Sequence, residues 1–169
     1  MMITPLDRQL TAGVRDLMLL GDPYVQARTP SDYWLYAELF SNTCPVALAG
    51  DDIIGAIIAF RSQTAPGEIY VQDVMTHPRH RRKGVTKVLL GCLVQQAQAW
   101  SCKRLYLTSE PSNRAAHGTW LTLGFTNAGG DITIDGVSVV KNFKGPGKDR
   151  AVYELMLPDA STGEVAVSR

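Results

Sequence analysis

Basic residues are concentrated in one short segment, THPRHRRKGVTKVLLGCL (residues 76–93), in which residues 79–83 carry five basic or imidazole side chains. Gly84 and an apolar run follow at once. Three kinds of chemistry fit such a cluster: a nucleic-acid patch, a solvated loop, or the mouth of an anion site. A charge run taken alone most often marks a solvated loop.

The position of Gly84 favours the anion site. A glycine in the first turn of a helix that follows a strand leaves several backbone N–H groups without partners, and the helix dipole adds positive potential there. Gly84 lets the backbone approach a ligand closely, and Arg81 and Lys83 would add charge-assisted bonds to phosphate oxygens. A Walker loop, GxxxxGK(S/T), and a Rossmann fingerprint are both absent from the sequence.

Asp73 is a second residue that could do chemistry. In IYVQDVM, strict alternation along a strand places Asp73 on the same face as Ile69, Val71 and Met75, in an apolar neighbourhood. Burial there raises the pKa of a carboxyl group and makes it a better base near neutral pH. The alternative is a structural carboxylate bonded to backbone amides, and a bulge in the strand would change the face of Asp73.

The elements that must position these groups follow from hydrophobic periodicity. Residues 5–20 predict one helix and residues 31–40 a second, capped by Ser31 or Thr29. Further helices are predicted over residues 84–100 and 112–123. Strands are predicted over residues 45–50, 53–60, 67–77, 103–109 and 150–157, with another from Phe125. This order predicts an α/β (α+β) fold with a mixed sheet.

The bulk composition is that of one ordinary globular domain. Of the 169 residues, 45% are apolar and 20% charged, which argues against disordered and fibrous classes. We expect a single domain over residues 1–158 and a flexible tail over residues 159–169. The formal net charge of +1 argues against a dedicated nucleic-acid or membrane-surface protein.

Hydropathy and cysteine usage indicate a cytoplasmic protein. No apolar stretch reaches the roughly 18 residues of a transmembrane helix, and the first residues lack the pattern of a secretory signal. Cys44, Cys92 and Cys102 have no metal-ligand spacing, so no metal is expected. Cys92 lies in an apolar helical run, where we expect a buried free thiol.

Two segments together resemble the motifs of a known family. VMTHPRHRRKGVTKVLL resembles motif A of the GNAT superfamily of acyl-CoA-dependent N-acyltransferases, Q/R-x-x-G-x-G/A after a strand, with Arg81 and Gly84 at its first and fourth positions. NRAAHGTWLTLGF resembles the second motif, N-x-x-A-x-x-F/L-Y-x-x-x-G-F, at Asn113, Ala116, Gly124 and Phe125. Both motifs occur in the right order, and the resemblance covers residues 45–126.

The resemblance implies a mixed central sheet flanked by helices and splayed between strand 68–77 and strand 103–109. It also implies a coenzyme A site. Backbone amides that would bind its pyrophosphate belong to Arg81, Arg82, Lys83, Gly84, Val85 and Thr86. The pantetheine arm would pair with the strand end at Val74, Met75 and Thr76. Asn113 would bond the pantetheine or orient a water, with helix capping as the alternative.

Two residues depart from the family motifs. Thr86 stands where glycine or alanine is usual, so its hydroxyl would add a bond to the pyrophosphate or its bulk would weaken binding. Trp120 stands where a tyrosine often protonates the departing thiolate, and an indole cannot give up its proton at these pH values. Trp120 is therefore a candidate for binding the cofactor, or a core residue.

Acyl transfer to an amine needs a general base, for which Asp73 is the first candidate and Glu110 the second. The alternative for Glu110 is an acid at a helix start. Asn113 is the third catalytic candidate. The family binds its acceptor with the N-terminal third, where the substrate-binding candidates, together with Asp73, are Tyr24, Arg28, Tyr33 and Trp34. In the later loop NFKGPGKDRAVYEL, Lys144 and Lys148 are available to an anion.

The leading hypothesis is an N-acetyltransferase that moves an acetyl group from acetyl-CoA to the primary amine of a small molecule, by direct attack in a ternary complex. The alternative, suggested by Trp120, is an acyl-CoA-binding regulatory module with little or no catalysis. A nucleic-acid binder is the third hypothesis, against which the near-neutral charge counts. We expect a small amine as partner, neither nucleic acid nor membrane, and, by family habit, a homodimer.

Overall fold

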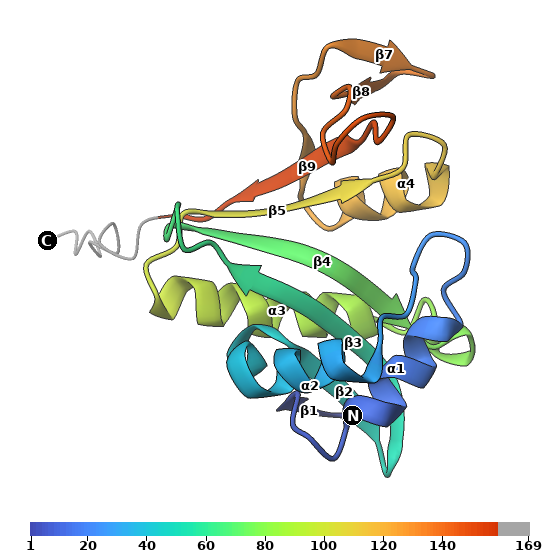
Figure 1. Ribbon diagram of the computed structural model, residues 1–169, viewed down its shortest axis with the longest axis vertical. Coiled ribbons are helices and arrows are strands. Elements are labelled where there is room, and N and C mark those ends of the chain that lie inside the picture. Colours follow the sequence, from blue (N-terminus) through green and yellow to red (C-terminus); the bar gives the residue numbers. More distant parts are fainter. Residues whose placement is uncertain (159–169) are drawn as a thin grey trace, which may run out of the picture.

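The computed structural model describes residues 1–158 (Figure 1). The helices are α1 (Thr11–Leu19), α2 (Pro30–Leu39), α3 (Val85–Ala99) and α4 (Arg114–Thr122), with 3-10 turns η1 (Ser41–Thr43) and η2 (Pro78–His80). The strands are β1 (Met2–Pro5), β2 (Pro45–Ala49), β3 (Asp52–Arg61), β4 (Glu68–Thr76), β5 (Arg104–Ser109), β6 (Thr126–Asn127), β7 (Ile132–Ile134), β8 (Val137–Val139) and β9 (Ala151–Met156). The tail predicted over residues 159–169 lies outside the described residues.

Seven of these strands form one sheet in the order β1-β2-β3-β4-β5-β9-β6. β4 and β5 pair in parallel, and the other neighbours in the sheet pair antiparallel. β7 and β8 form a separate hairpin, whose turn holds Asp135 and Gly136 at positive φ. The predicted α/β fold with a mixed sheet is confirmed.

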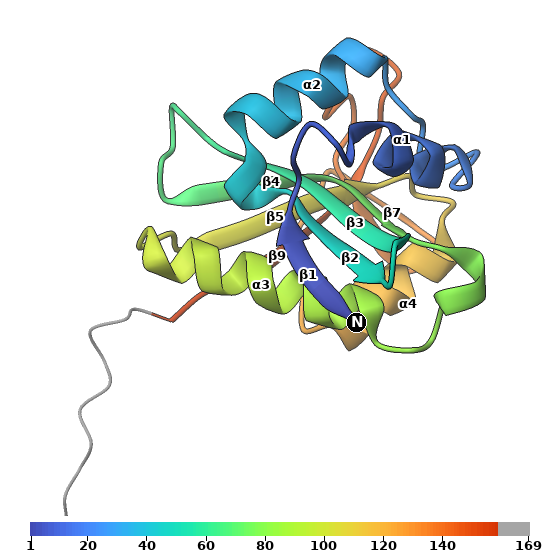
Figure 2. The same cartoon turned by 90° about the horizontal axis from the view of Figure 1, so that it is seen from below.

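Each face of the sheet carries two helices, α1 and α2 on one side and α3 and α4 on the other (Figure 2). Leu89 and Leu93 of α3 belong to one buried cluster, against which Trp120 of α4 also packs. Val14 of α1 and Tyr33 of α2 belong to the other buried cluster. The two faces therefore have separate cores with the sheet between them.

The first helix is shorter than the sequence predicts. The periodicity predicts a helix over residues 5–20, but Met2–Pro5 form the edge strand β1 and α1 begins only at Thr11. The Asp7 carboxylate accepts hydrogen bonds from the backbone amides two and three residues further on, at 2.8 and 3.0 Å. This local turn closes the strand and delays the helix.

The second helix begins with a capping box, which decides between the two predicted caps. Thr29 Oγ1 accepts from the Asp32 amide at 3.3 Å, and Asp32 Oδ2 accepts from the Thr29 amide at 2.9 Å. Thr29 is therefore the cap, and Ser31 lies within the helix. The capping box fixes where the α1–α2 loop ends.

The parallel pairing of β4 and β5 stops half-way along both strands. It runs from Glu68 opposite Arg104 to Val71 opposite Leu107, although β4 continues to Thr76. Beyond this point the two strands diverge (Figure 1). The predicted splay is confirmed. Beyond Val71, the edge of β4 that faces β5 has no strand paired with it, whereas the opposite edge stays paired with β3.

A bulge at Gln72 reverses the face of β4 just before Asp73. Ile58 of β3 lies opposite Asp73, whereas the next residue of β3 lies opposite Val71, so Gln72 is an extra residue. Val71 packs in the cluster under α3, and Met75 packs in the cluster under α1 and α2. Asp73 therefore shares a face with Met75, as predicted, but not with the two preceding apolar residues of the strand, for which the prediction is wrong.

The start of α3 packs directly on the backbone of β3. A Cβ atom at Gly55 would lie 2.6 Å from Val85 Cγ1 and 3.0 Å from Leu89 Cδ1. The absence of a side chain at Gly55 thus lets the helix approach the sheet. This contact fixes the distance between the sheet and the loop that precedes α3.

The three cysteines are free. Cys44 and Cys102 are buried, and burial raises the pKa of the Cys44 thiol to about 12. Cys92 is only half-buried, which differs from the prediction, because its place on α3 lies beside the leucine stripe and not within it. Within residues 1–158 no helix has both the length and the apolar character needed to span a membrane.

Candidate functional site

A cavity of about 340 Å³ opens at the splay between β4 and β5. Three parts of the chain line it: the α1–α2 loop, the diverging strand ends together with the start of α4, and the loop before β9. Its titratable and polar side chains include those of Tyr24, Arg28, Asp73, Ser109, Glu110, Asn113, Trp120, Lys144, Lys148 and Arg150.

Asp73 is the buried acid of this cavity. Its exposed fraction is 8%, and its Oδ2 atom has no hydrogen-bond partner within residues 1–158. Burial raises the pKa of the Asp73 carboxyl above its ordinary 3.8, while the positive charges of Arg28 and Lys144 act in the opposite direction. A carboxylate with a raised pKa and an oxygen to spare is suited to accept a proton from a bound ligand.

Two basic side chains that influence Asp73, Arg28 and Lys144, come from two separate loops that line the cavity. The backbone of Arg28 is fixed, because its carbonyl accepts from Arg15 Nε at 3.1 Å and its N–H donates to Tyr33 Oη at 3.4 Å. Lys144 Nζ lies 5.0 Å from the ring centroid of Tyr70. The α1–α2 loop and the loop before β9 thus each bring one positive charge toward the carboxylate.

Glu110 is more exposed than Asp73. Its Oε1 lies 3.7 Å from Nη2 of Arg150, and 54% of its side chain is exposed. α4 begins only at Arg114, so Glu110 is not an acid in the first turn of a helix, which was the alternative at the level of sequence. Lys148 adds a fourth basic side chain, so the cavity holds four basic and two acidic side chains.

The wall formed by β5 and α4 carries polar groups of a different kind. Asn113 caps α4, since its Oδ1 accepts from the Ala116 amide at 3.1 Å, and it also lines the cavity. Trp120 Nε1 donates to Ser109 Oγ at 3.1 Å. Trp120 is thus part of the cavity wall as well as a neighbour of the core.

The basic loop, residues 79–84, follows the C-terminal end of β4. Arg82 and Gly84 both have positive φ, 60° and 79°, and residues 81–84 are exposed. Within the described chain, no group accepts a hydrogen bond from the backbone amides of residues 82–87. Thr86 Oγ1 lies 2.9 Å from Thr76 Oγ1, so its hydroxyl ties the helix start to the end of β4.

Two predicted substrate-binding residues do not reach the cavity. Tyr33 is fully buried in the core beneath α2, where burial raises the pKa of its phenol. Trp34, one residue further round the helix, is 48% exposed and lies beside Arg8. The helical turn separates both side chains from the cavity, while Tyr24 and Arg28 of the preceding loop do line it.

Of the predicted cofactor-binding residues, Val74, Asn113 and Trp120 line the cavity. Met75 is 5% exposed and packs in the core, so it can offer only its backbone to a ligand. Sequence reasoning missed Ser109 and Arg150. The divergence of β4 from β5 opens the cavity beside them, and this feature has no local signal in the sequence.

A comparison with known families decides the identity of the fold. The model of the acetyltransferase (GNAT) family matches residues 16–125, well over half of the chain. The chain belongs to the GNAT family of acetyltransferases. The family resemblance predicted from residues 74–90 and 113–125 is therefore confirmed.

Within the GNAT family, several curated relatives share a name. L-2,4-diaminobutyric acid acetyltransferase of Marinococcus halophilus is 29% identical over 91 residues, 54% of this chain and 53% of that protein. The protein of the same name from Bordetella parapertussis is 29% identical over 92 residues, 54% of this chain and 50% of that protein. The chain thus spans about half the length of the curated relatives it matches.

Solved GNAT structures share the fold over nearly the whole chain. Diaminobutyrate acetyltransferase EctA from Paenibacillus lautus, in complex with L-2,4-diaminobutyric acid and coenzyme A, gives a TM-score of 0.73 at 24% identity, covering 93% of this chain and 94% of that chain. An aminoglycoside 6'-N-acetyltransferase complexed with coenzyme A gives 0.69 at 15% identity, covering 94% and 98%. At these identities the likeness shows the fold alone.

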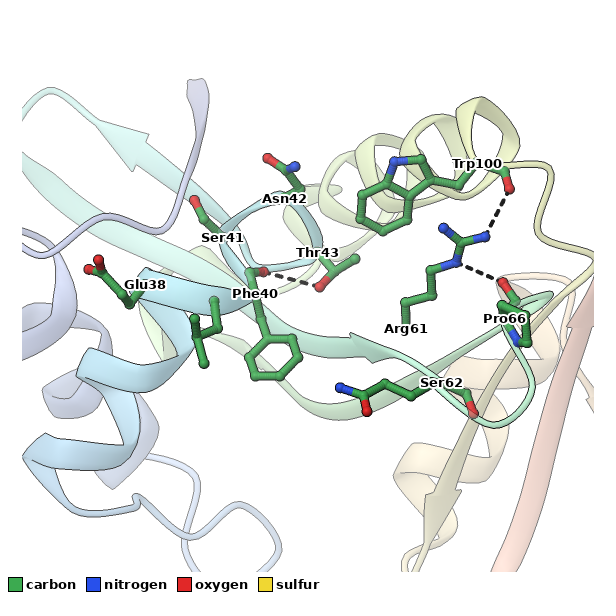
Figure 3. Close-up of a pocket in the computed structure, with 11 residues that line it drawn as sticks. Glu38, Phe40, Ser41, Asn42, Thr43, Arg61, Ser62, Pro66 and Trp100 are labelled. Atoms are coloured by element: carbon green, nitrogen blue, oxygen red, sulfur yellow. Dashed lines mark hydrogen bonds between the residues drawn. The ribbon is translucent and has the colours of Figure 1, made fainter.

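A larger cavity of about 640 Å³ lies at the other end of the GNAT sheet (Figure 3). Arg61, on its wall, donates to the carbonyls of Pro66 at 2.7 Å and Trp100 at 3.3 Å and stacks 5.2 Å from the Trp100 ring. Glu38 is paired with Arg8 at 2.8 Å. The charged side chains of this larger cavity, Glu38 and Arg61, thus have partners, whereas Asp73 Oδ2 has none within residues 1–158. No group of three or more possible metal ligands occurs within residues 1–158.

Proposed function

We propose that this protein is an N-acetyltransferase that moves an acetyl group from acetyl-CoA to the primary amine of a small molecule bearing a carboxylate. The main support is the unpartnered oxygen of buried Asp73, which lines a cavity with four basic side chains. A carboxylate base suits an ammonium group, and the basic side chains suit the acceptor's own anion. The names of the relatives make L-2,4-diaminobutyric acid the first acceptor to test.

The residues present fit coenzyme A. The amides of residues 82–87, which lack acceptors within the described chain, lie at a helix start where a pyrophosphate would meet both N–H groups and the helix dipole. Around Gly84 no atom lies within 4 Å of the position of a Cβ atom, so there is room for a phosphate. Beyond Val71, the edge of β4 is not paired with β5 and can take an extended pantetheine arm as an added strand.

The proposed chemistry uses residues from both sides of the sheet. Acetyl-CoA supplies the activated thioester. Asp73 takes a proton from the acceptor's nitrogen, directly or through a water, and so provides the neutral amine that attacks. A C–N bond forms as the C–S bond breaks, the electron pair remains on sulfur, and the surplus proton of the new amide nitrogen leaves to solvent. The edge of β4 near Val74 would offer a backbone N–H to the carbonyl oxygen, and Arg28 and Lys148 would hold the acceptor's carboxylate.

The test is thiol release from acetyl-CoA over a panel of amino acids, diamino acids, polyamines and aminoglycosides. We expect turnover with L-2,4-diaminobutyric acid, and a KM about tenfold or more higher for its carboxamide, which lacks the anion. Lys148→Met should raise the KM of the carboxylate substrate and leave the carboxamide unaffected. Lys141→Met, an exposed position of the same loop outside the cavity lining, is the matched control.

Turnover confined to amines without a carboxylate would contradict the proposed acceptor class. Failure of every amine, with acetyl-CoA still bound, would favour a second function, an acyl-CoA-binding regulatory module. The observation that favours this alternative is the Trp120 indole, which donates to Ser109 and has no proton to give a thiolate. Robust turnover of any amine would exclude it.

A further inference from the structure

In the family motif a tyrosine is usual at the position of Trp120, and the structure shows that the indole at this position contacts Ser109. The Trp120 indole can only donate a hydrogen bond, so Ser109 Oγ must be the acceptor in their 3.1 Å contact. The hydroxyl proton of Ser109 is therefore directed to some other acceptor. Within residues 1–158 this hydroxyl donates to no other group, and the half-buried Ser109 lines the cavity, so a bound ligand can accept from it.

Ser109 stands where the splay begins to widen. It is the last residue of β5, two residues past the final β4–β5 pair, and it lines the cavity. Leu107, two residues earlier, belongs to the cluster under α3, so Ser109 points to the α3–α4 side of the sheet, where Trp120 lies. Asp73 lies on the α1–α2 face. The base and the Ser109 hydroxyl thus approach the gap from opposite faces.

Other proton donors are less well placed. His117 Nδ1 and the Tyr153 hydroxyl bond to each other at 2.7 Å, and neither lines the cavity. Tyr24, the one tyrosine of the described residues that lines the cavity, belongs to the α1–α2 loop on the side of Asp73. Ser109 is the hydroxyl on the opposite wall that is already oriented by a neighbour.

We propose that Ser109, oriented by the Trp120 indole, donates a hydrogen bond to the sulfur of coenzyme A as the C–S bond breaks. Ser109 keeps its proton in this step. The electron pair of the broken bond stays on sulfur, and the thiolate later takes its proton from solvent. This role rests on the proposed acetyltransferase function and makes Ser109 a catalytic residue, whereas Trp120 is a positioning residue that acts through Ser109.

The decisive readout is the pKa of the coenzyme A thiol in the binary complex, which needs no acceptor. Thiolate absorbance at about 240 nm is followed against pH, and a matched titration with S-methyl-coenzyme A, which has no thiol to titrate, removes the tyrosine background. A hydrogen bond to a charged acceptor is worth roughly tenfold or more in equilibrium, so Ser109→Ala should raise the thiol pKa by about 1 pH unit. None of the variants in this titration replaces one of the charged side chains of the cavity, which are those of Arg28, Asp73, Glu110, Lys144, Lys148 and Arg150.

Further variants distinguish the loss of the Ser109 hydroxyl from a general structural effect of substitution. Ser109→Thr, which keeps a hydroxyl, should restore the wild-type thiol pKa, and Trp120→Phe should raise it partly. Ser112→Ala, an exposed serine three residues on and outside the cavity, and Tyr24→Phe should leave it unchanged. In turnover, Ser109→Ala should lower kcat about tenfold or more while the KM of acetyl-CoA changes little. Trp120→Tyr in the Ser109→Ala background should recover kcat.

Two results would overturn the role of Ser109: a thiol pKa that is the same in wild type and Ser109→Ala, or a rise of equal size in Tyr24→Phe. The proposed function fails separately. If Ser109→Ala raises the thiol pKa but the wild type acetylates no amine, Ser109 contacts the sulfur as proposed and the enzyme assignment is wrong. If the wild type acetylates amines and Ser109→Ala changes neither readout, only the role of Ser109 is wrong.

Discussion

Asp73 has the features of a residue retained for chemistry at the expense of stability. It is buried, one of its oxygens has no hydrogen-bond partner within residues 1–158, and the nearest charges that lower its pKa belong to two separate loops. A buried carboxylate without its full set of partners destabilises a fold. Its removal should therefore affect stability and activity in opposite directions.

We expect Asp73→Asn to be more stable than the wild type at neutral pH, by roughly 1 kcal/mol, because the amide has no charge to desolvate. The pKa of Asp73 is raised in the folded state, so the folded protein binds this proton more tightly than the unfolded chain. The wild type accordingly loses stability as pH rises through that folded pKa. The advantage of the variant is full above this pH, shrinks as pH falls from the folded pKa toward 3.8 and is absent below 3.8, and denaturant titrations at several pH values measure it.

The same substitution should reduce kcat/KM about a hundredfold or more, the usual contribution of a general base. In the wild type the acidic limb of the pH profile should lie above the range of an ordinary carboxyl, since burial raises the pKa of Asp73. The limb should be absent in Asp73→Asn. An unchanged limb in the variant would assign the base to another group, with Glu110 next to be tested.

At the scale of the elements, we expect acetyl-CoA binding by the basic loop to depend on the backbone of the loop more than on its side chains. Gly84 has φ +79° and Gly50, in the β2–β3 turn, has φ +63°, and a Cβ atom at either would meet nothing within 4 Å. Gly84→Glu and Gly50→Glu should each cost about 1–2 kcal/mol, the penalty of the left-handed region for a residue with a side chain. Only Gly84→Glu places a negative charge at the helix start, so only it should abolish acetyl-CoA binding in calorimetry. Equal affinities for acetyl-CoA in the two variants would contradict the assignment of the pyrophosphate site to this loop.

The contact between α3 and β3 positions that loop. A methyl group at Gly55 would lie 2.6 Å from Val85 Cγ1, so Gly55→Ala should push the start of α3 away from the sheet, destabilise the fold by roughly 1–3 kcal/mol and weaken acetyl-CoA binding. Gly91→Ala, on the same helix with open space around it, should instead stabilise by up to about 1 kcal/mol. Thermal unfolding and calorimetry of the pair compare both effects. An unaltered affinity in Gly55→Ala would show that the loop does not depend on this contact.

The sequence predicts the elements between residues 45 and 125 well, because their periodicity is strong and each is punctuated by glycine or proline. It does not predict β1 (Met2–Pro5), of which only Pro5 falls within the helix predicted over residues 5–20. The Gln72 bulge has no signal in the sequence, since it arises from the register with β3. That one extra residue moves Asp73 to the α1–α2 face, so the prediction that it shares a face with Ile69 and Val71 is wrong, whereas its proposed role as base stays a prediction. Ser109 and Arg150 need the splay, which is a property of three strands together.

At the scale of the whole molecule, the sheet separates the two sets of groups to which we assign roles in acyl transfer. The helix start that fits coenzyme A and the Ser109–Trp120 pair belong with the α3–α4 side, whereas Asp73 faces the α1–α2 side together with Arg28. The splay connects the two faces at one cavity. Donor and acceptor would therefore enter from different sides and meet without displacing one another.

This arrangement predicts direct transfer in a ternary complex. Initial velocities measured against both substrates should give intersecting double-reciprocal lines, because both are bound before the C–N bond forms. No cysteine of residues 1–158 lines the cavity, so a variant with Cys44, Cys92 and Cys102 all changed to alanine should keep its turnover, apart from the loss of stability expected at the two buried sites. Parallel lines, or a burst of coenzyme A release without acceptor, would instead indicate an acyl-enzyme. The nucleophile would then have to be sought among the cavity hydroxyls, with Ser109 first, which would replace its proposed role as a hydrogen-bond donor.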